Sequence, residues 1–294
     1  MTNFTTGVFG CDTPDPGLEQ WTHFKEVLAQ GKNTAKRQVA QLHRIPAYIT
    51  VLAKNNTVSG GNLKESHIQQ LLDEGNKFLS YGFYLDTSVD KTHRYLRPDL
   101  FDPNSGKFTG DFFDIQTKYH RGEGDYASLN IIILFRHQDW YKNETFTTRE
   151  PDGEIWTGWH SSYGGSVGQG SMPFDTLWNA NNAKELEIGD GILVSSGTIP
   201  NVAHPGSKGS LSTFAHEVGH WLGLHHTDYS GLKDSWGRKT CDPVNDGIHD
   251  TPTHIIDTNV AEIMKSCPSQ GQVNTCQHLD NRPDLIYNLM TPKH

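Results

Sequence analysis

Long apolar segments are missing from this chain of 294 residues, because no hydrophobic run approaches the roughly 18 residues that a membrane-spanning helix needs. An excess of basic residues is missing too, since 25 Lys and Arg stand against 34 Asp and Glu, for a formal net charge of −9. Without a basic patch, nucleic-acid binding has no support in the sequence. We therefore expect neither a membrane partner nor a nucleic-acid partner.

Cysteine is scarce, and three of the four cysteines, Cys241, Cys267 and Cys276, lie close to the C-terminal end. In a secreted protein such residues staple irregular structure, whereas a cytosolic protein needs another use for them. We expect disulfide chemistry and an extracellular location, although residues 1–10 lack the charged and apolar regions of a signal peptide.

Residues 216–226 carry a metal-binding pattern, because their sequence HEVGHWLGLHH has the spacing H-E-x-x-H-x-x-G-x-x-H. On a helix, residues four positions apart lie on one face, so His216 and His220 direct their imidazoles at a common point. Apolar residues recur at three- and four-residue steps through 211–222, which favours that helix. The alternative is a helix that carries histidines by chance, and the fixed offsets of the five specified residues disfavour it.

A third ligand must reach the metal from another direction to leave a tetrahedral zinc ion with one open position. Gly223 tolerates left-handed backbone angles and can end the helix, so that His226 returns toward the metal. His225 is the neighbouring alternative, but the spacing from glycine to histidine favours His226. Glu217 stands beside the ligands without being one, which suits a general base.

Predicted strands and helices alternate along the chain, which indicates an α/β layer architecture. We predict strands at 47–53, 83–87, 129–135 and 191–195, and helices after Asn62, at 111–121 and around the histidines. The apolar run at 130–135 is typical of a central strand that is covered on both faces. For residues 136–170 we predict a long irregular insert. Its glycine-rich end, 164–170, is predicted to be a flexible loop, because it lacks the Lys-Ser/Thr pair of a phosphate-binding loop.

The composition also suggests a division of the chain. Residues 1–44, with a helix that opens near Pro16, are predicted to be an N-terminal extension or pro-segment. Residues 45–294 are predicted to be a catalytic domain, in which 45–226 form an upper subdomain. Residues 227–294 are rich in Asp, Asn, Pro and Cys, which predicts a lower, irregular subdomain without a core of its own.

Several segments together resemble one protein family. Its specific marks are the motif at 216–226, the run DGIHDTP at 246–252 and Met290, and DYASLNIIIL at 125–134 and DGILVSSGTIP at 190–200 support them. The chain resembles the pappalysin-type metzincin zinc metalloproteases, and in particular their fungal extracellular members. The resemblance implies a metzincin-like fold of the α/β (α+β) class. In that fold a twisted mixed sheet carries helices over the active-site helix, and a small, irregular, disulfide-tied subdomain follows.

The resemblance also implies roles for individual residues. His216, His220 and His226 resemble the zinc ligands, and Glu217 resembles the general base. Met290 resembles the methionine of a turn that lies beneath the metal in this family.

Two further features are implied by the same likeness. Cys241 is expected to pair with Cys276. Asp246, the Ile248 carbonyl and Thr251 resemble the ligands of a calcium ion, which prefers hard oxygen atoms. The ordinary alternative is a turn in which Asp and Asn side chains bond their own backbone.

We expect a secreted zinc-dependent endopeptidase in which Glu217 activates a zinc-bound water for attack on the peptide bond. The expected partners are protein or peptide substrates, and the expected state is a monomer. One alternative is a zinc-bearing binding module that has lost catalysis, because Pro292 stands where the family has Tyr and the sequence ends four residues after Met290. Retention of Glu217 argues against it, since a structural zinc site does not need that group. A hydrolase of non-peptide amides is the third hypothesis.

Cys11 stands far upstream of the other cysteines, in a Cys-Asp-Thr sequence that resembles the Cys-Gly-Thr of some family pro-segments. A thiolate is a strong zinc ligand, so Cys11 can take the fourth position and hold the enzyme latent. Two other hypotheses remain open: Cys11 forms a disulfide with Cys267, or it is a free thiol.

Overall fold

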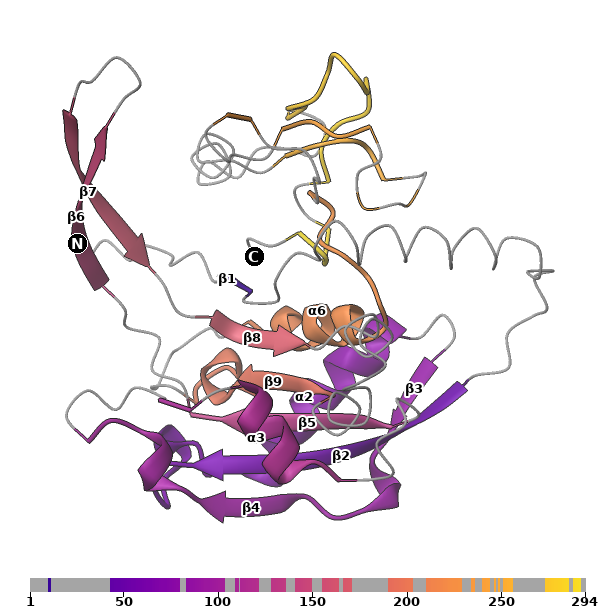
Figure 1. Ribbon diagram of the computed structural model, residues 1–294. Coiled ribbons are helices and arrows are strands. Elements are labelled where there is room, and N and C mark those ends of the chain that lie inside the picture. The colour runs from indigo at the N-terminus through magenta and orange to yellow at the C-terminus, as the bar shows by residue number, and fades with distance from the viewer. Residues whose placement is uncertain are drawn as a thin grey trace, which may run out of the picture.

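A twisted sheet with helices on both faces forms the centre of the molecule (Figure 1). The computed structural model describes residues 10–11, 43–79, 83–103, 109–110, 112–121, 128–135, 141–149, 155–163, 166–170, 190–202, 210–228, 234–235, 240–243, 246, 248, 251–255, 273–285 and 288–291. None of the helices in these ranges is long and apolar enough to cross a membrane.

The main sheet has seven strands. From one edge it runs through β1 (Gly10–Cys11), β8 (Ser166–Gly170), β9 (Ile192–Ser195), β5 (Leu129–Leu134), β2 (His43–Ala53) and β3 (Phe83–Asp86), while β4 (His93–Leu96) also pairs with β2. β8 is antiparallel to β9, and the other pairs are parallel. The sheet is therefore mixed, as the family resemblance led us to expect, and the strands that run opposite to the others, β8 and β1, lie at one edge.

The three α-helices of the described residues divide between the two faces of the sheet. α2 (Glu65–Leu79) and α6 (Ser212–Trp221) cover one face, whereas α3 (Phe112–Tyr119) covers the other. β5 shows the division, because Ile131 and Ile133 pack in the larger core cluster with α2 and α6, and Ile132 packs in the smaller cluster with α3. All six residues of β5 are buried. The predicted central strand, covered on both faces, is thus confirmed.

Short elements complete the described part of the chain. Four 3₁₀ helices span Val58–Gly60, Thr87–Val89, Pro98–Leu100 and Ser196–Thr198. A separate two-stranded antiparallel sheet joins β6 (Tyr141–Arg149) to β7 (Ile155–Tyr163), and Figure 1 shows this hairpin projecting from the main sheet.

The predicted strands and the helices of the α/β core are confirmed, but two predictions for residues 136–170 were wrong. The stretch holds the hairpin of β6 and β7 instead of an irregular insert, and its glycine-rich end forms β8 instead of a flexible loop. Threonine and aromatic residues favour strands, and in 141–163 their preference outweighs that of glycine and serine for irregular structure. Glycine within a strand also marks a place where another backbone approaches closely, as it does in β8.

Beyond α6, the described residues contain no helix and no strand. A disulfide joins Cys241 to Cys276, with 5.7 Å between their Cα atoms, so the predicted pairing is confirmed. The division into residues 1–44, 45–226 and 227–294 stays a prediction, and β2 begins at His43, close to the first boundary. The helix predicted near Pro16 lies outside the described residues.

Candidate metal centre

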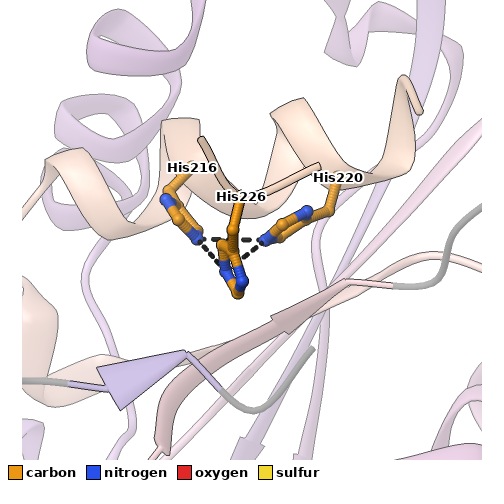
Figure 2. A group of neighbouring side chains, drawn as sticks. All are labelled: His216, His220 and His226. Atoms are coloured by element: carbon orange, nitrogen blue, oxygen red, sulfur yellow. Dashed lines mark hydrogen bonds between the residues drawn. The ribbon is translucent and has the colours of Figure 1, made fainter. Parts of the chain in front are cut away.

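The histidines of the sequence motif converge on one point (Figure 2). The Nε2 atoms of His216 and His220 lie 3.0 Å apart, those of His220 and His226 lie 3.1 Å apart, and those of His216 and His226 lie 3.3 Å apart. All three residues are buried. Within the described ranges, no other group of three or more His, Cys, Asp or Glu residues has its ligand atoms close enough to hold a metal ion.

Local structure explains how the third histidine returns. α6 carries His216 and His220 on successive turns and ends at Trp221. Gly223 then adopts a left-handed backbone with φ of 92°, a conformation that costs glycine little, and the Leu224 amide donates to the Gly219 carbonyl over 2.9 Å. The reversal at Gly223 that the sequence predicted is therefore present.

Two backbone carbonyls orient the histidine rings. His216 Nδ1 lies 2.5 Å from the Leu289 carbonyl oxygen, and His220 Nδ1 lies 2.7 Å from the Leu224 carbonyl oxygen. A carbonyl oxygen only accepts, so each Nδ1 carries the hydrogen and each Nε2 presents a lone pair to the centre. The sequence motif does not mark either carbonyl, because any residue supplies one.

The donor set fits a zinc ion. An ion about 2.0–2.1 Å from three tetrahedrally arranged nitrogens would separate them by about 3.3 Å, close to the observed spacing of the Nε2 atoms. Burial lowers the pKa of His220 well below its ordinary value, and the neighbouring imidazoles of His226 and His216 lower it further. The ring is therefore neutral, which is the form that binds a metal.

The turn around Met290 packs against α6 from the C-terminal part of the chain. A Cβ at Gly219 would lie only 2.5 Å from Met290 Sδ, so the methionine occupies the space that the glycine leaves. The Thr227 amide donates to the Met290 carbonyl over 3.1 Å, which ties this turn to the segment just after His226. The structure thus brings Met290 beneath the helix of the ligands, although the two are distant in sequence.

A buried hydrogen-bonded group holds the C-terminal end of α6 to the sheet. Trp221 Nε1 donates to Asp190 Oδ2 over 3.0 Å, and the other oxygen of Asp190 lies 3.1 Å from His120 Nε2. Asp190 lies two residues before the start of β9 and is buried. Sequence reasoning missed this group, because no spacing relates residues that meet only in the folded chain.

Glu217 is completely buried, at 0% exposure, on the part of α6 that β8 covers.

The residues of the predicted calcium site lie apart from the histidines in the sequence. Asp246 is buried, and its Oδ1 accepts from the Ile248 amide over 3.0 Å, while the Ile248 carbonyl accepts from the Thr251 amide over 3.1 Å. This is the hydrogen bonding of an Asp turn, and the calcium site stays a prediction.

The backbone of Cys11 lies in β1, where it pairs with Gly168 of β8. Cys267 and Pro292 lie outside the described residues. The hypothesis of a disulfide between Cys11 and Cys267 therefore stays untested, and so does the effect of Pro292 in place of the family's tyrosine.

Comparison with known proteins agrees with this geometry. The chain is 25% identical to an extracellular metalloprotease of Podospora anserina, over 97% of this chain and 85% of that protein. It is also 25% identical to an extracellular metalloprotease of Colletotrichum graminicola, over 97% of this chain and 86% of that protein. The expected resemblance to fungal extracellular metalloproteases is confirmed. No protein-family profile matches the chain.

Solved structures share the fold. Mature mirolysin of Tannerella forsythia, in complex with a cleaved peptide, aligns with a TM-score of 0.52 at 16% identity, over 86% of this chain and 84% of that one. A promirolysin variant of Tannerella forsythia aligns with a TM-score of 0.53 at 16% identity, over 95% of this chain and 86% of that one. The predicted metzincin-like α/β fold is therefore confirmed, whereas the pappalysin subtype stays a prediction.

Proposed function

We propose that this chain is a zinc-dependent metalloendopeptidase of the pappalysin-type metzincins. The observation that carries the proposal is the convergence of His216, His220 and His226, whose Nε2 atoms lie within 3.0–3.3 Å of one another. The named relatives and the shared fold support it. The proposed substrates are proteins or peptides, and the proposed location is extracellular.

The residues of the chain divide the chemistry between them. His216, His220 and His226 would hold the zinc, which when bound supplies Lewis-acid polarisation of oxygen atoms. Glu217 accepts a proton from the attacking water while the water oxygen bonds to the carbonyl carbon of the substrate. Glu217 then passes a proton to the leaving amine as the C–N bond breaks. The Leu289 and Leu224 carbonyls fix the rings, so that little reorganisation is needed during the reaction.

A binding module of the same fold without catalysis is the competing proposal. The retained Glu217 disfavours it, because a structural zinc site does not require a carboxyl group beside its ligands, and this one is buried to 0% exposure at a desolvation cost. A structural zinc site would be served equally well by an apolar residue at this position.

Latency is a further part of the proposal. β1 pairs with β8, and β8 is the strand that covers Glu217. We propose that the segment carrying Cys11 keeps the enzyme inactive until it is removed, with the thiolate as a fourth zinc ligand. A disulfide to Cys267 and a free thiol are the competing outcomes.

Metal analysis combined with cleavage of denatured casein tests the proposed function. We expect one zinc per chain, cleavage that a zinc chelator abolishes, and recovery when zinc is returned. Protein that binds one zinc but cleaves neither casein nor other unfolded proteins, with or without residues 1–44, would favour the binding module.

A further inference from the structure

Two glycines of β8 form a bare strip of backbone that lies against α6. Gly168 and Gly170 are both buried, and their alternate positions place them on the same face of the strand. A Cβ added at Gly168 would lie 2.4 Å from Glu217 Oε1 and 2.6 Å from Glu217 Cγ. A Cβ added at Gly170 would lie 2.9 Å from the Glu217 carbonyl oxygen and 3.1 Å from His220 Cβ.

Space, and not backbone conformation, explains these glycines. The described glycines with positive φ are Gly61, Gly191 and Gly223, so Gly168 adopts angles that alanine also adopts. Real Cβ atoms essentially never approach another heavy atom within 3.0 Å, however, and the contact at Gly168 is well below that limit. Any side chain at this position must displace either the Glu217 carboxyl group or β8 itself.

β8 has little freedom to move away. It is hydrogen-bonded to β9, where Gly168 pairs with Val194 and Gly170 pairs with Ile192, and both β9 residues are 0% exposed. The carboxyl group sits at the end of a side chain with rotatable bonds, so it is the group that moves more easily. A side chain at position 168 would therefore shift the carboxyl group away from its present place.

We propose that Gly168 is a positioning residue for Glu217: its missing side chain leaves the space in which the carboxyl group is held for proton transfer. The proposal rests on the proposed function, in which Glu217 is the general base. It assigns a purpose to one glycine of β8, which the zinc motif does not include.

A matched control exists at another contact of the same helix. Gly75 of α2 is buried against Phe214 of α6, and a Cβ there would lie 2.4 Å from Phe214 Cε1, the same distance as at Gly168. Gly75→Ala therefore introduces a clash with the same nearest distance into α6 without touching the carboxyl group. It separates overpacking in general from displacement of Glu217.

The experiment is a double-mutant cycle on the zinc-loaded protein with Gly168→Ala, Gly75→Ala and Glu217→Ala, and with each glycine change also combined with Glu217→Ala. Melting temperatures are measured on the full chain, and kcat is measured after the proteolytic trimming that the latency proposal requires. Gly168→Ala should keep zinc and lower kcat by about tenfold to a hundredfold, the scale of a displaced catalytic group. It should lower the melting temperature in the wild-type background but not in the Glu217→Ala background, where the clashing side chain is gone. Gly75→Ala should lower the melting temperature in both backgrounds and leave kcat within about twofold, because the overpacked group is not catalytic.

Each result bears on the proposal. A Gly168→Ala protein with wild-type kcat, or one whose loss of melting temperature is the same in both backgrounds, overturns it. If Gly168→Ala alone does not fold, a folded double variant supports the proposal and an unfolded double variant overturns it. A failure of the proposed function is seen separately, as Glu217→Ala that cleaves casein at the wild-type rate, whereas the melting temperatures still report whether Gly168 and Glu217 are in contact.

Discussion

The part of the chain up to the end of α6 and the part after it are stabilised in different ways. The first part buries apolar side chains between the sheet and the helices, as in β5, where every residue is buried. In the second part the described residues form no helix or strand, yet buried polar groups are frequent: Asp228, Asp242, Asp246, His254 and Asp284. Among the described residues there, hydrogen bonds and a disulfide take the place of an apolar core cluster.

Asp284 illustrates the desolvation cost of burying polar groups in this region. The side chain is 0% exposed, and burial raises the pKa of its carboxyl group, although hydrogen bonds from Thr275 oppose the shift. The Thr275 amide lies 3.1 Å from each carboxyl oxygen. Nearby, His254 Nδ1 lies 2.8 Å from the Pro252 carbonyl oxygen. Such contacts specify a shape but add little hydrophobic stabilisation, so this region should depend on covalent and ionic reinforcement.

The candidate metal centre joins the two regions. α6 supplies His216 and His220, while the second region supplies His226, the Leu289 carbonyl and Met290. Changes to each region should therefore have distinct consequences. A change in α6 can abolish peptide hydrolysis while zinc stays bound. A change in the second region should weaken zinc binding, because the turn that packs against α6 is less well held.

The largest expected effect is that of Glu217→Ala. We expect it to keep one zinc per chain and to lower peptide hydrolysis by at least about a hundredfold, the usual scale for loss of a general base. Casein cleavage and metal content, measured on the same preparation, check this. Wild-type cleavage with zinc retained would show that the proposed mechanism is wrong.

Cys11→Ala is expected to have the next largest effect, since it tests whether the predicted pro-segment, residues 1–44, controls the site. If Cys11 holds the enzyme latent, the full-length variant should cleave casein without proteolytic trimming, whereas the wild type should need it. The assay compares intact chains whose length is verified by mass. An unchanged need for trimming would leave the disulfide to Cys267 or the free thiol, which non-reducing peptide mapping distinguishes.

Removal of the disulfide should act on the second region. Replacing Cys241 and Cys276 together by Ala opens a loop of sequence separation 35, and we expect a loss of about 2–4 kcal/mol in the free energy of unfolding. Zinc should also bind more weakly, because the turn of Leu289 and Met290 loses support. Denaturant unfolding and zinc competition with a chromophoric chelator measure the two effects. Equal stability and equal zinc affinity would show that the disulfide does not hold this region together.

Calcium removal is expected to have the smallest effect. If Asp246, the Ile248 carbonyl and Thr251 bind Ca²⁺, a calcium-selective chelator with free zinc buffered should lower the melting temperature by a few degrees, because the ion stabilises only the folded chain. Asp246→Asn is the control and should abolish the response to the chelator. Melting curves that coincide with and without calcium would leave the Asp turn as the correct interpretation of this segment.

Sequence patterns predicted much of the framework because the relevant physics is local. An unbroken apolar run predicted the doubly covered strand β5, and the periodicity of residues 211–222 predicted α6. The same locality explains the wrong predictions at 136–170, where glycine and serine suggested irregular structure. A side chain at Gly168 or Gly170 of β8 would clash with α6, which lies about fifty residues farther along the chain. No local sequence pattern shows this contact.

The sequence by itself determined the ligand spacing and the point at which the helix ends, since a helical turn and the left-handed freedom of Gly223 are properties of short segments. The Cys241 and Cys276 pairing came only from the family resemblance. Only the tertiary structure decided which groups surround the site: the Leu289 carbonyl, Met290 beneath Gly219, Asp190 on Trp221 and Gly168 against Glu217. Backbone carbonyls and bare glycines carry no chemical signature in a sequence, so their function appears only when folding brings distant segments into contact.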